Sequence, residues 1–171
     1  GISIMSELRT NRIVPRDGLP AGSAGGIIQV VHATATTGVS QSYSTNSFAD
    51  TGLSATITPT RSDSKILVTG YLSYYSSTGH GSSEFNFAVC DGSNNILDGT
   101  TADTQGYRIN EMYVIGGKHP INFLHSPSTT SAFTYKIRMN AKQANTSGAL
   151  YTQINSTGNN ISRITLMEVS G

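Results

Sequence analysis

Four histidines and one cysteine are the side chains best suited to metal binding or catalysis: His32, His80, His119, His125 and Cys90. His119 and His125 are six residues apart, Pro120 lies between them, and no pair of cysteines accompanies them. Zinc sites use different spacings and usually a Cys or His pair on each side. The sequence therefore predicts no metal and no cofactor. One arrangement stays open, a symmetric oligomer that brings copies of one histidine together on its axis.

A serine hydrolase or a phosphate loop is not indicated either. The G-x-S-x-G elbow that presents a nucleophilic serine is missing, and residues 80–84, HGSSE, are typical of a Gly/Ser loop that enters a strand. Residues 116–118, GGK, lack the phosphate-loop pattern, because Met112 stands where the first glycine belongs and His119 replaces the Ser or Thr. We expect a hairpin bend at the two glycines.

Four carboxylates in neighbouring segments, Asp91, Asp98, Asp103 and Glu111, are the remaining candidates for acid–base chemistry. Glycoside hydrolysis uses such a carboxylate pair. Glycosidase sites also carry aromatic platforms for the sugar, and this sequence has no Trp. We therefore predict no catalytic residues and no enzyme, with a carbohydrate-cleaving domain as the enzymatic alternative.

Composition narrows the function further. The 171 residues include 11 Lys and Arg and 10 Asp and Glu, a net charge of +1, which argues against a general nucleic-acid binder. No stretch approaches 20 apolar residues, and the first residues, GISIMSELRTNR, contain no apolar leader, so we expect neither membrane insertion nor a secretory signal. The single Cys90 lies in an apolar run, FNFAVCD, and is expected to be a buried thiol.

From residue 26 onward the sequence alternates apolar and polar residues in short runs separated by turn residues. Examples are GIIQVVHATATT, LSATITPT, SKILVTGYLSYYSS, SEFNFAVCD, AFTYKIRMNAK and NISRITLMEV. Period-two alternation is typical of strands with one buried face, and no window fits an amphipathic helix. About ten such strands predict an all-β, antiparallel β-sandwich or jelly roll over residues 26–171.

Tyrosines on the predicted strands point to a subunit interface. In the 64–77 run, Ile66, Val68 and Leu72 share one face, and Tyr71 and Tyr75 lie on the other with Leu67. Two further tyrosines, Tyr107 and Tyr113, lie on a second strand. A strand that is apolar on both faces is either buried on both faces or lies at a subunit interface. We expect a homotrimer with these four tyrosines at the contact; scattered surface tyrosines are the alternative.

Residues 1–25 form a separate unit, an extended arm and linker. Pro15, Pro20 and a run of glycines prevent a regular element there. Three arginines supply charge and two aliphatic residues an apolar contact, so the predicted anchoring residues are Arg9, Arg12, Ile13, Val14 and Arg16. A disordered tail is the alternative.

Several segments carry a resemblance to a known family. They are the arm with its continuation MSELRTNRIVPRDGLPAGSAGGIIQVVHATATT, then FADTGLSATITPTRSDSKILVTGYLSYY, INFLHSPSTTSAFTYKIRM and the terminal SRITLMEV. Together they resemble small tail-fibre-type structural proteins of marine and cyanobacterial tailed phages, over nearly the whole chain. The body also resembles the trimeric jelly roll of the complement C1q and tumour-necrosis-factor type. The arm is short, without a coiled-coil or β-helical shaft.

The resemblance implies a non-enzymatic component of the surface of a phage particle. The arm would bind other virion proteins, and a trimeric jelly-roll head would face outward as a tail fibre that binds a host-surface glycan or protein. A capsid decoration protein that docks its arm on the shell is the nearest alternative. Two others belong to different classes, a carbohydrate-binding or depolymerase module and a secreted C1q-like recognition module.

Overall fold

The computed structural model of the chain describes residues 26–43, 45, 47–78, 83–98, 107–109, 114–142, 148–155 and 158–170. Within these residues the regular elements are all β-strands, and no helix is present that could cross a membrane. The strands are β1 (Ile27–Ala35), β2 (Val39–Ser42), β3 (Phe48–Ile57), β4 (Lys65–Thr78), β5 (Ser83–Asp91), β6 (Ile96–Asp98), β7 (Tyr107–Ile109), β8 (Val114–His125), β9 (Phe133–Lys142), β10 (Gly148–Thr152), β11 (Ile154–Asn155), β12 (Gly158–Asn159) and β13 (Ser162–Val169).

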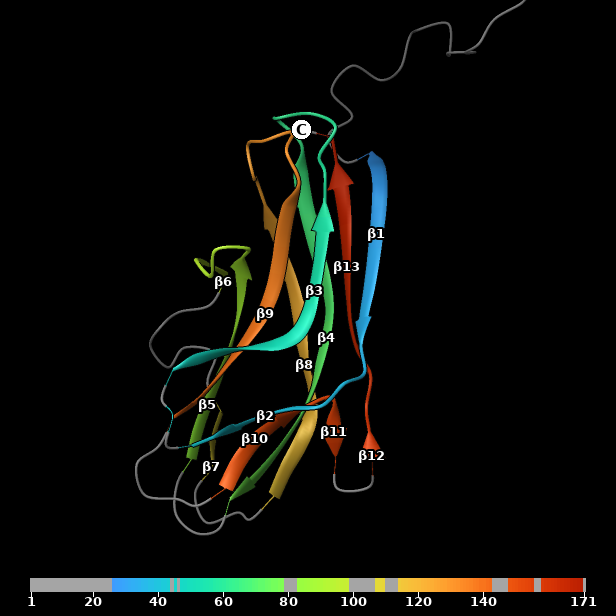
Figure 1. The fold of residues 1–171 in the computed structure, drawn as a ribbon. Helices are drawn as coiled ribbons and strands as arrows, with labels where there is room; N and C mark the ends of the chain where they lie inside the picture. Colours follow the sequence, from blue (N-terminus) through green and yellow to red (C-terminus); the bar gives the residue numbers. More distant parts are fainter. Residues whose placement is uncertain are drawn as a thin grey trace, which may run out of the picture.

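Two antiparallel sheets pack face to face as a sandwich (Figure 1). The six-stranded sheet has the order β1-β13-β4-β10-β2 with β8 also paired to β4, and the five-stranded sheet has the order β3-β9-β5-β6 with β7 also paired to β5. β11 and β12 form a separate two-stranded ribbon. The chain crosses between the sheets six times, from β2 to β3, to β4, to β5, and later from β7 to β8, to β9 and to β10. This interleaved order is a jelly roll, and it confirms the fold class expected from the sequence.

Alternating apolar side chains fill the space between the sheets. Leu53 and Ile57 of β3 are buried while their neighbours along the strand are exposed. The predicted inner face of β4, Ile66, Val68 and Leu72, is completely buried. Burial of one such aliphatic side chain contributes roughly 2 kcal/mol. The period-two pattern therefore identified the core faces of these strands correctly.

The long strand β4 organises the six-stranded sheet. One edge of β4 pairs with β8 over twelve consecutive residues. The other edge has two partners in turn, β13 opposite residues 65–71 and β10 opposite residues 74–78. β4 therefore joins the half of the sheet that contains β1 and β13 to the half that contains β10 and β2.

A buried polar junction closes the gap between the two partners of β4. The backbone N–H of Ser73 donates to the hydroxyl of Ser162 at 2.9 Å, and the hydroxyl of Ser73 donates to the carbonyl of Ile161 at 2.8 Å. The backbone N–H of Gln153 donates to the carbonyl of Ser73 at 3.0 Å. Ser73, Gln153 and Ser162 are all buried. These bonds satisfy the backbone of β4 on the edge where neither β13 nor β10 pairs with it.

Gly70 permits the close approach of β4 and β13. Its φ of +153° lies in a region that side chains disfavour, and a Cβ there would lie 2.1 Å from the carbonyl oxygen of Arg163. That oxygen belongs to the backbone of the paired strand, so it cannot move without breaking the ladder. The position therefore requires glycine.

The hairpin bend predicted at Gly116-Gly117 is wrong. Both glycines lie inside β8, which runs without interruption opposite β4. The two glycines lie opposite Tyr75 and Tyr74 in the ladder. A Cβ on Gly116 would lie 3.2 Å from the carbonyl oxygen of Tyr74, so β8 lies close to β4 at this position. Pairing along β4 overrides the local preference of Gly-Gly for a turn.

The described chain begins and ends at the same end of the sandwich, called here the arm end. The N–H of Ser170 donates to the carbonyl of Gly26 at 3.0 Å. Beside them the buried carboxylate of Glu168 accepts hydrogen bonds from Gln29 at 2.6 Å and from the N–H and hydroxyl of Thr60 at 2.7 and 2.8 Å. Burial raises the pKa of Glu168, but these hydrogen bonds outweigh burial and lower the pKa from 4.5 to about 2. Glu168 thus ties β13 to β1 and to the β3–β4 loop.

The substitution Gly70→Ala is expected to destabilise the fold by about 2 kcal/mol or more, because the added methyl group meets a backbone oxygen of β13. Chemical denaturation followed by circular dichroism measures the change. Gly92→Ala is the matched control, since a Cβ there makes an ordinary 3.6 Å contact with Thr134. Equal stability of the two variants would contradict the account of the β4–β13 approach.

Candidate functional site

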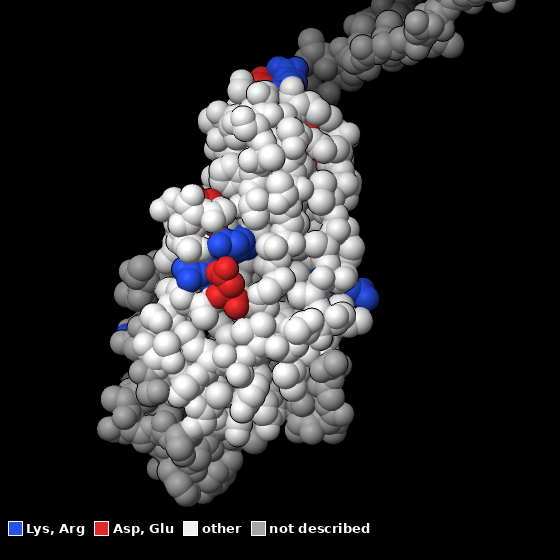
Figure 2. All heavy atoms as spheres, in the orientation of Figure 1, with Lys and Arg blue, Asp and Glu red and all other residues white. Residues whose placement is uncertain are grey.

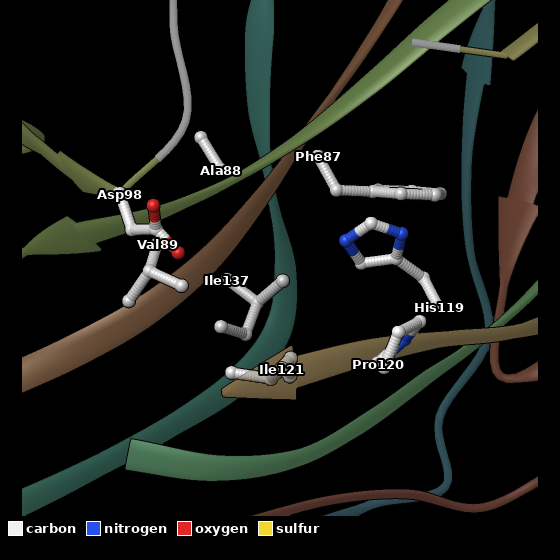
Figure 3. Close-up of a pocket in the computed structure, with 8 residues that line it drawn as sticks. All are labelled: Phe87, Ala88, Val89, Asp98, His119, Pro120, Ile121 and Ile137. Atoms are coloured by element: carbon white, nitrogen blue, oxygen red, sulfur yellow. The ribbon is translucent and has the colours of Figure 1, made fainter. Parts of the chain in front are cut away.

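A small pocket opens on one side of the sandwich, between the edge strand β8 and the strands β5, β6 and β9. Phe87, Ile121 and Ile137 form its apolar wall, and His119 and Asp98 supply its ionisable groups. Figure 3 shows that the His119 ring lies against the Phe87 ring and that Asp98 lies at the other end of the pocket, with Ile137 between them. The pocket therefore separates the two ionisable groups.

His119 is a packed, neutral imidazole. Its ring centroid is 4.9 Å from that of Phe87. Burial lowers the pKa of His119, and the negative charge of Asp98 opposes this only in part. His119 therefore packs against an aromatic ring, and Figure 3 shows Asp98 at the other end of the pocket. The wall between them is mainly apolar.

The other histidines lie elsewhere. His125 contacts the hydroxyl of the buried Tyr135 through Nδ1 at 2.9 Å. Burial lowers the pKa of His125 and raises that of Tyr135. His32 lies on the opposite, outer face of the six-stranded sheet, with Nδ1 3.0 Å from the hydroxyl of Thr165. His80 is outside the described residues. No group of three metal-ligating side chains occurs in the described part of the chain.

The candidate carboxylates do not form a catalytic pair. Asp91 caps its own turn, accepting hydrogen bonds from the N–H groups of Ser93 and Asn95 at 2.8 and 2.9 Å. Hydrogen bonds from Asn95 lower the pKa of Asp91. Asp98 lines the side pocket, while Asp103 and Glu111 lie outside the described residues. Asp91 therefore has a structural role that accounts for its position.

Cys90 is completely buried, as the sequence predicted. Burial raises the pKa of its thiol. Thiolate, the reactive form, is disfavoured by a raised pKa. We assign Cys90 to packing.

One group of charged side chains lies over β3 and β9 on the face shown in Figure 2, which otherwise carries few charges. Arg138 Nε donates to Asp50 at 2.8 Å, and a second nitrogen of Arg138 donates to the carbonyl of Phe48 at 2.6 Å. Lys136 lies 3.4 Å from Asp50. β3 bulges at this point, with Gly52 at a φ of +79°. Arg138 and Asp50 therefore hold the bend of β3 onto β9 and are already paired.

The outer face of the six-stranded sheet has two different halves. In the half at the arm end, one cross-strand row is apolar across four strands: Val30 of β1, Met167 of β13, Leu67 of β4 and Leu124 of β8. Val30 is 56% exposed and Leu124 54% exposed. We call these four residues the apolar row. Ile27 and Ile28 at the start of β1 are also exposed.

The far half of the same face carries tyrosines. Tyr71 and Tyr75 of β4 point outward and are half-buried, and Tyr151 of β10 lies directly opposite Tyr75. The sequence singled out the first two but missed Tyr151, which is 76 residues from Tyr75 and reaches it only through the strand register. Tyr107 lies on β7, and Tyr113 lies outside the described residues. The structure therefore places Tyr71 and Tyr75 on one outward face together with Tyr151, and their part in a subunit contact remains a prediction.

The predicted anchoring residues Arg9, Arg12, Ile13, Val14 and Arg16 all lie outside the described residues. The described chain starts at Gly26, four residues before Val30 of the apolar row. The role of the arm remains a prediction.

No family model matches the sequence, and no curated protein matches it either. Among solved structures, one titled as infectious bursal disease virus, Gx strain, is 13% identical over 95% of this chain and 42% of that chain, with a TM-score of 0.45. A VP2 subviral particle of the same virus is 13% identical over 95% of this chain and 44% of that chain, with a TM-score of 0.41. This chain spans less than half the length of those viral chains, and the likeness concerns the strand arrangement alone.

Because the pKa of His119 is lowered in the fold, the unfolded chain binds a proton there more readily than the folded chain. Stability should therefore be complete above about pH 6.5, the ordinary histidine value, and fall as the pH drops below it. His119→Phe keeps a ring against Phe87 and removes the titration, so the variant should lose less stability than the original protein between pH 7 and pH 5.

Urea midpoints at the two pH values measure the effect. Asn122→Ser, at an exposed and non-titrating position of β8, is the control and should leave the pH dependence unchanged. An identical pH dependence in His119→Phe and the original protein would contradict the buried, neutral state of His119.

Proposed function

We propose that the chain is a non-enzymatic structural protein of a virus particle that works as a trimer. Its jelly-roll heads associate through the arm-end half of the outer face, and its arms bind the particle. The observation that carries this proposal is the apolar row, which runs across four strands in the arm-end half of the face and has two residues, Val30 and Leu124, that are more than half exposed. The sequence resemblance to phage tail-fibre-type proteins supports the virion role.

The chemistry of the apolar row suits contact with another copy of the chain. Exposed contiguous apolar surface on a soluble domain marks an interaction site, and interface centres are poor in charge. β1 extends this surface to the edge of the sheet, because in the described part of the chain it pairs only with β13. A free edge strand without charged side chains readily pairs or packs with another chain.

The position of the arm supports anchoring. Twenty-five residues precede Gly26, enough to reach up to about 80 Å when extended. Association at the arm end gathers three arms at one site and raises their effective concentration there. Arg9, Arg12 and Arg16 would supply charge-assisted hydrogen bonds to an acidic surface of the particle. In a tail fibre these arms would bind tail proteins, whereas in a capsid decoration protein they would bind the shell.

The described ionisable groups favour a non-enzymatic role. Asp91 caps a turn, Asp50 pairs with Arg138, and Glu168 holds two strands and a loop together. Each has a structural task that explains its environment. A depolymerase would need two carboxylates that face a common substrate position.

The trimer is tested by Met167→Lys, which places a charge in the centre of the apolar row. The original protein should have the mass of three 18.1 kDa chains by light scattering, and the variant should dissociate at micromolar concentration, because the buried charge lacks a partner. Thr56→Lys, on the outer face of the five-stranded sheet, is the matched control and should remain trimeric. A monomeric original protein, or a trimeric Met167→Lys variant, would contradict the proposed contact.

The arm is tested by deletion of residues 1–25. The truncated protein should keep its strand-rich circular dichroism spectrum and its oligomeric mass but should not be incorporated into particles, since the anchor is gone. Copy number in purified particles, measured by quantitative mass spectrometry, reports the result. Incorporation at the normal copy number would place the anchor in the jelly roll instead.

A further inference from the structure

We infer that the far half of the outer face of the six-stranded sheet binds an acidic polysaccharide, one whose sugar rings carry carboxylate groups. The inference goes beyond the proposed structural role and rests on that virion role only for its biological setting. The residues that carry it are three tyrosines, Tyr71, Tyr75 and Tyr151, and two cations, Lys118 and Arg163. We call these five residues the tyrosine face.

The strand register places the five residues on one continuous surface. Tyr151, Tyr75 and Gly116 are paired in one cross-strand row, and Arg163, Tyr71 and Pro120 are paired in another. Lys118, opposite Ser73, lies between the two rows. Tyr71 and Tyr75 are four residues apart on β4, about 13 Å along the strand. The surface is thus long enough for several linked sugars rather than one.

The three tyrosines of the tyrosine face are partly exposed to solvent. Tyr75 and Tyr151 lie with ring centroids 5.9 Å apart and planes tilted by 48°. Gly116 has no side chain to cover the neighbouring side of the Tyr75 ring, where a Cβ would lie 3.5 Å from that ring. Aromatic faces carry partial negative charge and attract the C–H groups of a sugar ring. Within the described part of the chain, the hydroxyls of these tyrosines make no hydrogen bond, so they remain free to bind sugar hydroxyls.

The cations give the surface its preference for acidic sugars. Lys118 Nζ lies 4.4 Å from the centroid of the Tyr71 ring, and Arg163 is paired with Tyr71 from the other side. Both side chains are exposed, and neither forms an ion pair among the described residues. The described carboxylates lie elsewhere. Asp50, Glu84 and Asp91 belong to the other sheet, and Asp98 lines the side pocket. Asp63 pairs with Arg61 in the β3–β4 loop, and Glu168 is buried. Two unpaired cations beside stacking rings complement a carboxylated sugar.

Single-stranded nucleic acid also combines rings with negative charge, but it fits this surface less well. A nucleic acid carries a phosphate at every nucleotide and is bound by grooves with many cations. The tyrosine face has two cations, and the whole chain has a net charge of +1. The density of charge therefore favours a polysaccharide.

Titration of the full-length protein with oligogalacturonate, a chain of carboxylated sugars, tests the inference by calorimetry. We expect binding that weakens with added salt, about tenfold weaker binding for Arg163→Gln and for Lys118→Gln, and a similar loss for Tyr75→Leu. Lys65→Gln is the matched control, an exposed lysine of the same sheet at the arm end, and should bind normally. Circular dichroism confirms that each variant is folded.

Three results would overturn the inference: no binding of oligogalacturonate at millimolar concentration, equal binding of the neutral maltohexaose, or equal or tighter binding of a thymidine 12-mer. An equal loss in Lys65→Gln would also overturn it, because the site would then not be the tyrosine face. Oligomeric mass and incorporation into particles are measured separately. If the original protein is trimeric and is incorporated into particles but does not bind the sugar, only this inference is refuted. If the original protein binds the sugar but is a monomer, the proposed trimer is refuted.

Discussion

The shared pairing of β4 is the constraint on which the rest of the structure depends. β4 is paired with β8 along one edge and with β13 and then β10 along the other, and the buried junction around Ser73 satisfies the backbone between those two partners. Gly70 lets β13 approach closely enough to pair. Without this arrangement the strands on the two sides of β4 would not share one outer face.

The strand register gives the two halves of that face different side chains. One row near the arm end aligns apolar side chains from four strands, whereas the rows farther along carry tyrosines with a nearby lysine and arginine. Self-association requires a surface poor in charge, and an acidic glycan requires a surface with unpaired positive charge. The two proposed contacts can therefore coexist on one sheet, the arm end packed against other copies and the far end accessible.

Period-two alternation was enough to predict the all-β class and the buried faces of β3 and β4, because each strand buries one face against the other sheet. It failed at Gly116-Gly117, where twelve-residue pairing with β4 outweighs local turn preference, and it missed β2, whose VSQS sequence has one apolar residue and is held by β10. The partnership of Tyr75 with Tyr151 and the separation of His119 from Asp98 depend on contacts between distant segments, which alternation does not encode. The buried Glu168 escaped notice for the same reason, since its donors Gln29 and Thr60 lie over 100 residues away.

A cryo-electron microscopy reconstruction of a particle that contains this chain tests the central claim most directly. The account predicts three copies around a three-fold axis, with the apolar row buried between copies, the arms in contact with the particle and the tyrosine face open to solvent. Density for single, separate copies, or for copies attached through the far half of the jelly roll, would contradict it.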